Sequence, residues 1–189
     1  IGSDAFVRNR FSGVLNLPES IRDVSTNAFN GNLFEGDIII PKSLKKISGG
    51  VFAGNEFNGQ LVLHENVEYI GQGAFSYNEI LGEIWLPNSL KYVGNEAFAN
   101  TRISHVYLPN SLGTMGKRAF ADTPISGSVV IPEAIVSISE GLFENCTFLE
   151  EVILSKNVIA IHDRAFSQCS SLKRVVIFSD DPPVLAENA

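Results

Sequence analysis

The side chains that could carry out chemistry in this chain are few: three histidines, two cysteines and some adjacent acidic residues. Histidine and cysteine are common ligands of Zn²⁺, and a histidine beside a hydroxyl or thiol is the usual general base of a hydrolase. Adjacent carboxylates, such as Glu150 with Glu151 and Asp180 with Asp181, could supply oxygen ligands to Ca²⁺. Each of these functions requires the fold to bring the side chains together.

A phenylalanine recurs through the whole chain at a nearly constant spacing. The positions are Phe6, Phe29, Phe52, Phe75, Phe98, Phe120, Phe143 and Phe166, which are 23 residues apart except for one interval of 22. We call them the marker phenylalanines. The residue three positions after each marker is Asn, Thr or Cys: Asn9, Asn32, Asn55, Asn78, Thr101, Thr123, Cys146 and Cys169. Such short side chains can hydrogen-bond a neighbouring backbone, so we predict that this row is buried and that its polar groups bond the backbone from turn to turn. We call the row the ladder.

Two apolar positions separated by one residue follow each marker, which indicates a short strand. The pairs are Leu15 with Leu17, Ile38 with Ile40, Leu61 with Leu63, Ile84 with Leu86, Val106 with Leu108, Val129 with Ile131, Val152 with Leu154, and Val175 with Ile177. Strands repeated in this way lie parallel, and parallel crossovers are right-handed in nearly all cases. The sequence predicts a mainly β, right-handed solenoid of about eight turns, with turns and short 3₁₀ segments opposite the strands.

The single 22-residue interval lies between Phe98 and Phe120. Comparison of RISHVYLP with EILGEIWLP places the missing residue at the position of Gly82, before the strand. A slip of one residue inside the strand would turn its core side chains outward. We therefore expect a shortened, kinked turn at residues 103–105 and an intact strand register.

The repeat separates the residues that could have acted together. His64, His105 and His162 fall at three different positions of the repeat, so they are expected in surface or turn roles and form no metal triad or catalytic pair. Cys146 and Cys169 share one position on adjacent turns, about 5 Å apart, which permits either a disulfide or two buried ladder thiols. The ladder favours free thiols, because Asn and Thr fill the same position elsewhere. The acidic pairs form no recurring carboxylate set, so they are interpreted as solvated charge, and no metal or cofactor is expected.

Composition excludes several kinds of partner. The chain of 189 residues is 44% apolar and 19% charged, with a net charge of -7 and its Lys and Arg residues scattered, so no nucleic-acid partner is expected. No apolar run approaches the roughly 18 residues of a membrane span, and the start IGSDAF is not a secretory leader. A solenoid filled with Phe and Leu side chains leaves no cleft, so we do not expect an enzyme.

The segments LPNSLKYVGNEAFAN and LSKNVIAIHDRAFSQCSSLKRVVI resemble leucine-rich repeats of the BspA-like type, and the likeness covers nearly all of residues 1–189. The resemblance implies one repeat array in a secreted or cell-surface protein of a host-associated bacterium, with a role in adhesion to host proteins or other cells. Both ends match the middle of a repeat, so the array is expected to be truncated at each end. Residues 179–189 depart from the repeat and are predicted to begin a C-terminal cap.

Within each strand, the residue between the two core positions must face outward. This outer row is Asn16, Ile39, Val62, Trp85, Tyr107, Val130, Ile153 and Val176. Trp85, the single tryptophan, and Tyr107 are neighbours at mid-array, with Glu83 and His105 beside them on the same face. We hypothesise that a host extracellular-matrix or cell-surface protein docks here, on Trp85, Tyr107, Ile39, Val62, Val130, Ile153, Glu83 and His105. The alternatives are the ordinary preference of exposed strands for β-branched residues, and an array that is purely a structural spacer.

Overall fold

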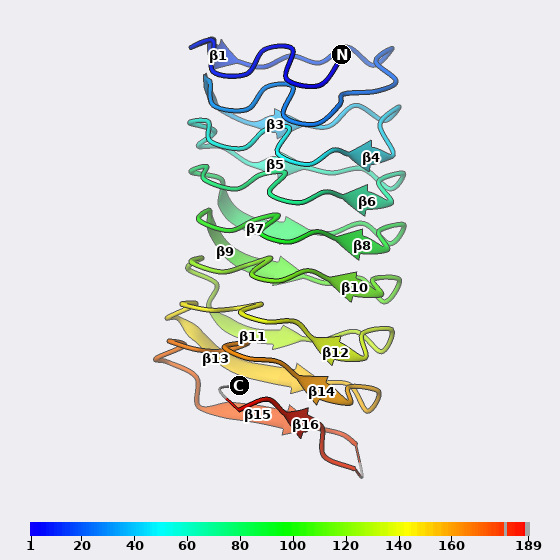
Figure 1. Ribbon diagram of the computed structural model, residues 1–189, viewed down its shortest axis with the longest axis vertical. Helices are drawn as coiled ribbons and strands as arrows, with labels where there is room; N and C mark the ends of the chain where they lie inside the picture. Colours follow the sequence, from blue (N-terminus) through cyan, green and yellow to red (C-terminus); the bar gives the residue numbers. More distant parts are fainter. Residues whose placement is uncertain (180, 188–189) are drawn as a thin grey trace.

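The computed structural model describes residues 1–179 and 181–187. These residues form a solenoid in which short parallel strands stack in two columns (Figure 1). The first column contains β1 (Ser12–Val14), β2 (Leu33–Glu35), β3 (Ile38–Ile39), β5 (Leu61–Val62), β7 (Leu81–Trp85), β9 (Arg102–Tyr107), β11 (Gly127–Val130), β13 (Leu149–Leu154) and β15 (Arg174–Ile177). The predicted mainly β solenoid of 23-residue repeats is confirmed, and the described residues contain no helix.

A second column of two-residue strands was not expected. It contains β4 (Lys46–Ile47), β6 (Tyr69–Ile70), β8 (Tyr92–Val93), β10 (Thr114–Met115), β12 (Ser137–Ile138), β14 (Ala160–Ile161) and β16 (Val184–Leu185). In each of the first six, the second residue is buried in the core, and the next residue is often glycine. At Gly94 an added Cβ would lie 2.5 Å from the backbone nitrogen of Gln72, so the two turns can approach this closely only without a side chain.

The marker phenylalanines form a continuous stack through the core. Neighbouring rings lie 5.3–6.2 Å apart and are inclined by 3–16° to each other. Markers within the array, such as Phe75 and Phe98, are completely buried, whereas Phe6 at the first turn is 37% exposed. Val175 and Ile177 on β15 occupy core positions of the repeat but are each 39% exposed, because no strand among the described residues pairs with β15 on the side away from β13.

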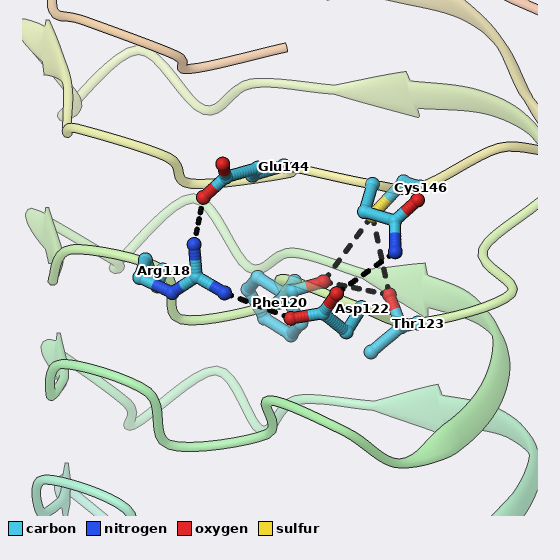
Figure 2. A network of polar contacts seen from close by, with 7 residues as sticks. Arg118, Phe120, Asp122, Thr123, Glu144 and Cys146 are labelled. Atoms are coloured by element: carbon cyan, nitrogen blue, oxygen red, sulfur yellow. Dashed lines mark hydrogen bonds and ion pairs between the residues drawn. The ribbon is translucent and has the colours of Figure 1, made fainter. Parts of the chain in front are cut away.

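The predicted ladder is confirmed by the hydrogen bonds of its side chains. Every marker carbonyl oxygen from Phe6 to Phe143 accepts a hydrogen bond from at least one ladder side chain. The Nδ2 group of Asn55 donates to both Phe29 O and Phe52 O, each at 3.0 Å. Farther along, Thr123 Oγ1 and Cys146 Sγ both donate to Phe120 O, at 2.7 and 3.2 Å (Figure 2). The ladder therefore satisfies buried backbone groups that no strand pairing reaches.

Two residues beside each marker phenylalanine have left-handed backbone conformations, one two positions before it and one two positions after it. The first set is Asp4, Asn27, Gly50, Gly73, Glu96, Arg118, Gly141 and Arg164, and the second is Arg8, Gly31, Gly54, Tyr77, Asn100, Asp122, Asn145 and Gln168. A left-handed residue interrupts any run of helical turns. In place of the expected 3₁₀ segments there are consecutive single turns, closed by bonds such as Ala99 N to Glu96 O at 3.1 Å.

The short interval between Phe98 and Phe120 preserves strand register, as predicted. β7 and β9 pair Ile84 with Val106 and Trp85 with Tyr107, and the register shifts only between Gly82 and Glu83. The expected kinked turn at residues 103–105 is wrong, because these residues belong to the six-residue strand β9. Opposite Gly82, whose φ is +81°, the pairing skips Ser104, so the irregularity is a one-residue bulge within β9 rather than a turn before it.

Candidate functional site

The outer row lies on the surface of the first strand column. Trp85, Ile39 and Val130 are 66%, 58% and 58% exposed, and Val62 is also exposed. Tyr107, Ile153 and Val176 are half-buried, and Asn16 is exposed. The core positions on both sides of Trp85, Ile84 and Leu86, are 1% and 6% exposed. The alternation predicted for these strands thus places the row outside.

Strand pairing brings the predicted site residues together in three groups. β3 and β5 pair Ile39 with Val62, β7 and β9 pair Trp85 with Tyr107, and β11 and β13 pair Val130 with Ile153. The same pairing of β7 and β9 sets Glu83 directly opposite His105. The row is therefore a series of cross-strand pairs, with its aromatic pair in the middle.

Trp85 and Tyr107 form the tightest aromatic contact of this face. Their ring centroids are 3.6 Å apart at an angle of 15°, and the His105 ring lies 4.6 Å from that of Tyr107. Partial burial, then the negative charge of Glu83 and a hydrogen bond with it, raise the pKa of Tyr107 above its ordinary value of 10.0. Because β7 and β9 are among the longest strands, the stacked pair sits on a well-paired backbone. The pair is a preformed aromatic surface with a carboxylate at its edge.

An open depression of about 470 Å³ adjoins the aromatic pair. It is lined by Gln60, Leu61, Val62, Leu63, Glu83 and Trp85. The Tyr107 ring covers one face of the indole, from the turn that follows Trp85, whereas the depression lies toward the turn that precedes it. The sequence did not predict Gln60 and Leu63 as site residues, because they neighbour the outer row without belonging to it.

A second aromatic pair lies on the other strand column and was missed from the sequence. The rings of Tyr69 and Tyr92 stack at 4.7 Å and 4°, and the Lys46 ammonium lies 5.2 Å from the Tyr69 ring. These tyrosines occupy one position of the repeat in β6 and β8. Both side chains are only half-buried, which makes them a natural comparison for Trp85 and Tyr107.

The histidines, which could have acted as metal ligands or as a general base, lie apart from one another. His64 is held in a turn, with Nε2 2.7 Å from Pro41 O and Nδ1 accepting the N–H of Asn66 at 3.1 Å. His162 lies beside Lys117 and Glu140, far along the chain from both other histidines. In residues 1–179 and 181–187, no group of three His, Cys, Asp or Glu side chains is placed to hold a metal ion.

Both cysteines are free, buried members of the ladder. Cys169 Sγ donates to Phe143 O at 3.1 Å, and Cys146 Sγ lies 3.3 Å from Thr123 Oγ1. Burial raises the pKa of Cys146 from 9.0 to about 12, which outweighs the opposing effect of the hydrogen bond with Thr123. Such a thiol is a poor nucleophile at neutral pH.

Of the two predicted acidic pairs, one forms ion pairs with the adjacent turn and the other lies partly outside the described residues. Glu150 pairs with Lys173 and Glu151 with Arg174, in both cases between adjacent turns. Asp181 is exposed, and Asp180 lies outside the described residues, as do two residues of the predicted cap, 188 and 189. Nothing in the described part of the chain is a helix long and apolar enough to cross a membrane.

Three solved structures of leucine-rich repeat proteins are similar to this chain. One from Bacteroides ovatus ATCC 8483 is 21% identical with a TM-score of 0.46, and the match covers 98% of this chain and 65% of that one. A leucine rich cell surface protein from Faecalibacterium prausnitzii A2-165 is 16% identical with a TM-score of 0.42, covering 97% and 80%. One from Eubacterium ventriosum ATCC 27560 is 15% identical with a TM-score of 0.44, covering 82% and 58%.

No curated protein matches the sequence. A protein-family model matches residues 1–126 and, in an overlapping second match, residues 76–181. The family is described as the BspA type leucine rich repeat region, in six copies. The two matches together span the repeats from the first marker to the last, so the chain belongs to the BspA-type leucine-rich repeat family.

Proposed function

We propose that this chain is a non-enzymatic binding module, located at the cell surface or outside the cell, that docks a protein partner on the outer row. The observation that carries the proposal is Trp85, a side chain 66% exposed to solvent yet fixed by stacking on Tyr107 at 3.6 Å. Exposed tryptophan is costly for solubility and contributes nothing to this core. Trp and Tyr are the residues most enriched where protein interfaces concentrate their binding energy.

The surroundings of the pair support an extended footprint. Exposed Ile39, Val62 and Val130 continue the apolar surface on neighbouring turns, and Glu83 and His105 provide polar groups at its edge. A paired sheet loses little conformational freedom when a partner binds, so most of the contact energy remains available for affinity. The family resemblance implies a partner among host extracellular-matrix or cell-surface proteins.

The test is a double variant, Trp85→Ala with Tyr107→Ala, compared with Tyr69→Ala with Tyr92→Ala on the other strand column. Binding to immobilised extracellular-matrix proteins and to host cells is measured for both, and denaturant unfolding shows that both remain folded. The first variant should lose at least tenfold in affinity, whereas the second should bind as the unaltered protein does. Unchanged binding by the first variant would contradict the proposal, and an unaltered protein that binds no surface would favour the structural spacer.

A further inference from the structure

The depression beside Trp85 combines an indole face with a carboxylate. The Tyr107 ring covers the indole on one side, and the depression opens on the other, between Trp85 and Val62. Glu83 lines the same depression, and the Val62 and Leu63 side chains supply its apolar wall. A ligand entering here meets an aromatic face, a negative charge and an aliphatic surface together.

Glu83 has no ion-pair partner among the described residues, whereas several acidic side chains of neighbouring turns do. Glu79 pairs with Arg102, and Glu68 lies 3.7 Å from both Lys45 and Lys91. Glu151, which occupies the position of Glu83 three turns farther on, pairs with Arg174. Within the row of Glu83, a basic side chain of the next turn thus neutralises Glu151, whereas Asp37 and Glu83 form no ion pair among the described residues.

The row that contains Glu83 carries no positive charge near it. The equivalent residues of the two preceding turns are Asp37 and Gln60, and that of the next turn is His105. Asp37 accepts the backbone N–H of Gln60 at 2.7 Å and meets no cation among the described residues. With a net charge of -7 on the chain, the local and the overall fields both favour a cationic ligand.

We infer that the depression receives an arginine side chain of the protein partner. The planar guanidinium stacks on the free face of Trp85 while donating to the Glu83 carboxylate, and its aliphatic stem lies on Val62 and Leu63. Lysine fits less well, because its compact ammonium cannot stack and donate in parallel. A neutral sugar would also stack on an indole, but the lining side chains offer it hydrogen bonds only from Gln60, Glu83 and the Trp85 Nε1–H, and its neutrality leaves the Glu83 charge without a counterpart. This inference rests on the proposed function and specifies the partner group that Trp85 meets.

Because Trp85 is the single tryptophan, its indole Nε1–H gives one resonance in a ¹⁵N spectrum that reports on the site directly. The protein is titrated with the peptide acetyl-Gly-Arg-Gly-amide, with the same peptide carrying citrulline or lysine, and with methyl α-mannoside. The arginine peptide should shift this resonance saturably, and the uncharged citrulline peptide should bind about tenfold more weakly. An equal response to citrulline, or a response to the sugar alone, would overturn the inference.

Charge variants separate the site from the general acidity of the chain. Glu83→Gln should weaken the arginine peptide about fivefold to tenfold, whereas Glu151→Gln, at the equivalent position beside Arg174, should not change it. Equal weakening by both variants would show non-specific attraction and contradict the inference. If the peptide binds but Trp85→Ala with Tyr107→Ala leaves partner binding intact, the proposed function fails and the arginine site stands. If that double variant abolishes partner binding and the peptide does not bind, the proposed function stands and the inferred arginine site fails.

Discussion

Two rows of side chains run the length of the solenoid, one inside it and one outside, and their chemistry changes along the chain in different ways. Inside, the ladder passes from Asn through Thr to Cys, yet each member from Asn32 to Cys169 donates to a marker carbonyl. Outside, the row stays aliphatic over most of its length and becomes aromatic at Trp85 and Tyr107.

The contrast separates what the fold requires from what it leaves free. Asn55, Thr123 and Cys146 have little in common except a short side chain with a donor, and that donor is what the buried backbone needs. No backbone group and no core contact requires an aromatic ring at position 85, because Ile39 and Val62 fill equivalent positions without one. A change in the ladder should therefore appear in stability, and a change in the aromatic pair in binding.

The largest effect is expected from Asn55→Ala. Its Nδ2 group donates to three carbonyl oxygens, and its Oδ1 accepts the N–H of Phe34 at 3.3 Å. Phe29 O and Phe52 O keep their hydrogen bonds from Asn32 and Asn78, but removal deletes four hydrogen bonds and leaves Ala53 O and the N–H of Phe34 without their side-chain partner. The free energy of unfolding should therefore fall by about 3 kcal/mol. Urea denaturation monitored by circular dichroism measures the change. A loss below about 1 kcal/mol would mean that the ladder merely fills space.

Cys146→Thr should change how stability depends on pH. The unfolded thiol loses its proton near its ordinary pKa of 9.0, whereas burial raises the folded pKa to about 12. Between these values the folded state binds more protons, so the contribution of Cys146 is fully present below pH 9 and is lost as pH rises toward 12. The difference in stability between the unaltered protein and the variant should be constant below pH 8 and shift in favour of the variant above pH 9.

The same thiols allow a simpler check of the ladder. Thiol titration of the denatured, unreduced protein should detect both Cys146 and Cys169, and the native protein should react slowly because both are buried. Detection of no thiol after denaturation would indicate a disulfide, and with it an oxidising compartment.

A smaller effect is expected at Asn78, the last asparagine of the ladder. Its Oδ1 atom is buried without a hydrogen-bond partner, unlike that of Asn55. Asn78→Thr removes this oxygen and keeps a donor to Phe75 O, as Thr101 does for Phe98 O at 2.8 Å. We expect a change within about 1 kcal/mol, and about 2 kcal/mol of destabilisation from the matched Asn55→Thr. Equal costs at both positions would show that the unpaired oxygen is unimportant.

The smallest effect on stability is expected from Trp85→Ala. The side chain is 66% exposed and its main contact is the stack on Tyr107, so the free energy of unfolding should change by less than about 1 kcal/mol. Urea denaturation of this variant beside Asn55→Ala tests the contrast between the two rows. A loss of more than about 2 kcal/mol would assign Trp85 to the fold and weaken the case for a docking surface.

The sequence predicts the main features of this fold because a single spacing repeats. The marker phenylalanines reveal the length of a turn, the apolar pairs reveal the first strand column, and the ladder follows from three residue types at one position. The second column escaped notice because a strand of two residues, such as Tyr92–Val93, is too short for alternation to be visible. Left-handed residues such as Tyr77 and Glu96 were equally hidden, since only glycine at such positions is recognisable in a sequence.

For the candidate site, too, one part was predictable from the sequence and another part was not. Alternation along the strand was enough to place Trp85 and Tyr107 outside and adjacent. The depression beside them depends on how Gln60 and Leu63 of the preceding turn lie against the indole. The lack of an ion pair at Glu83 depends on where the nearby lysine and arginine side chains point. The repeat pattern of the sequence does not show which side chains of different turns are in contact.

The hydrogen bonds between successive turns run along the long axis of the solenoid (Figure 1). A force applied between the two ends therefore loads the hydrogen bonds of one turn after another. It does not load many of them in shear at the same time. Each released turn frees 23 residues, which extend by at most about 80 Å. Under such a load, turns whose core side chains are partly exposed, such as those that contain Phe6 and Val175, should open before the turn of Trp85, whose core neighbour Ile84 is 1% exposed.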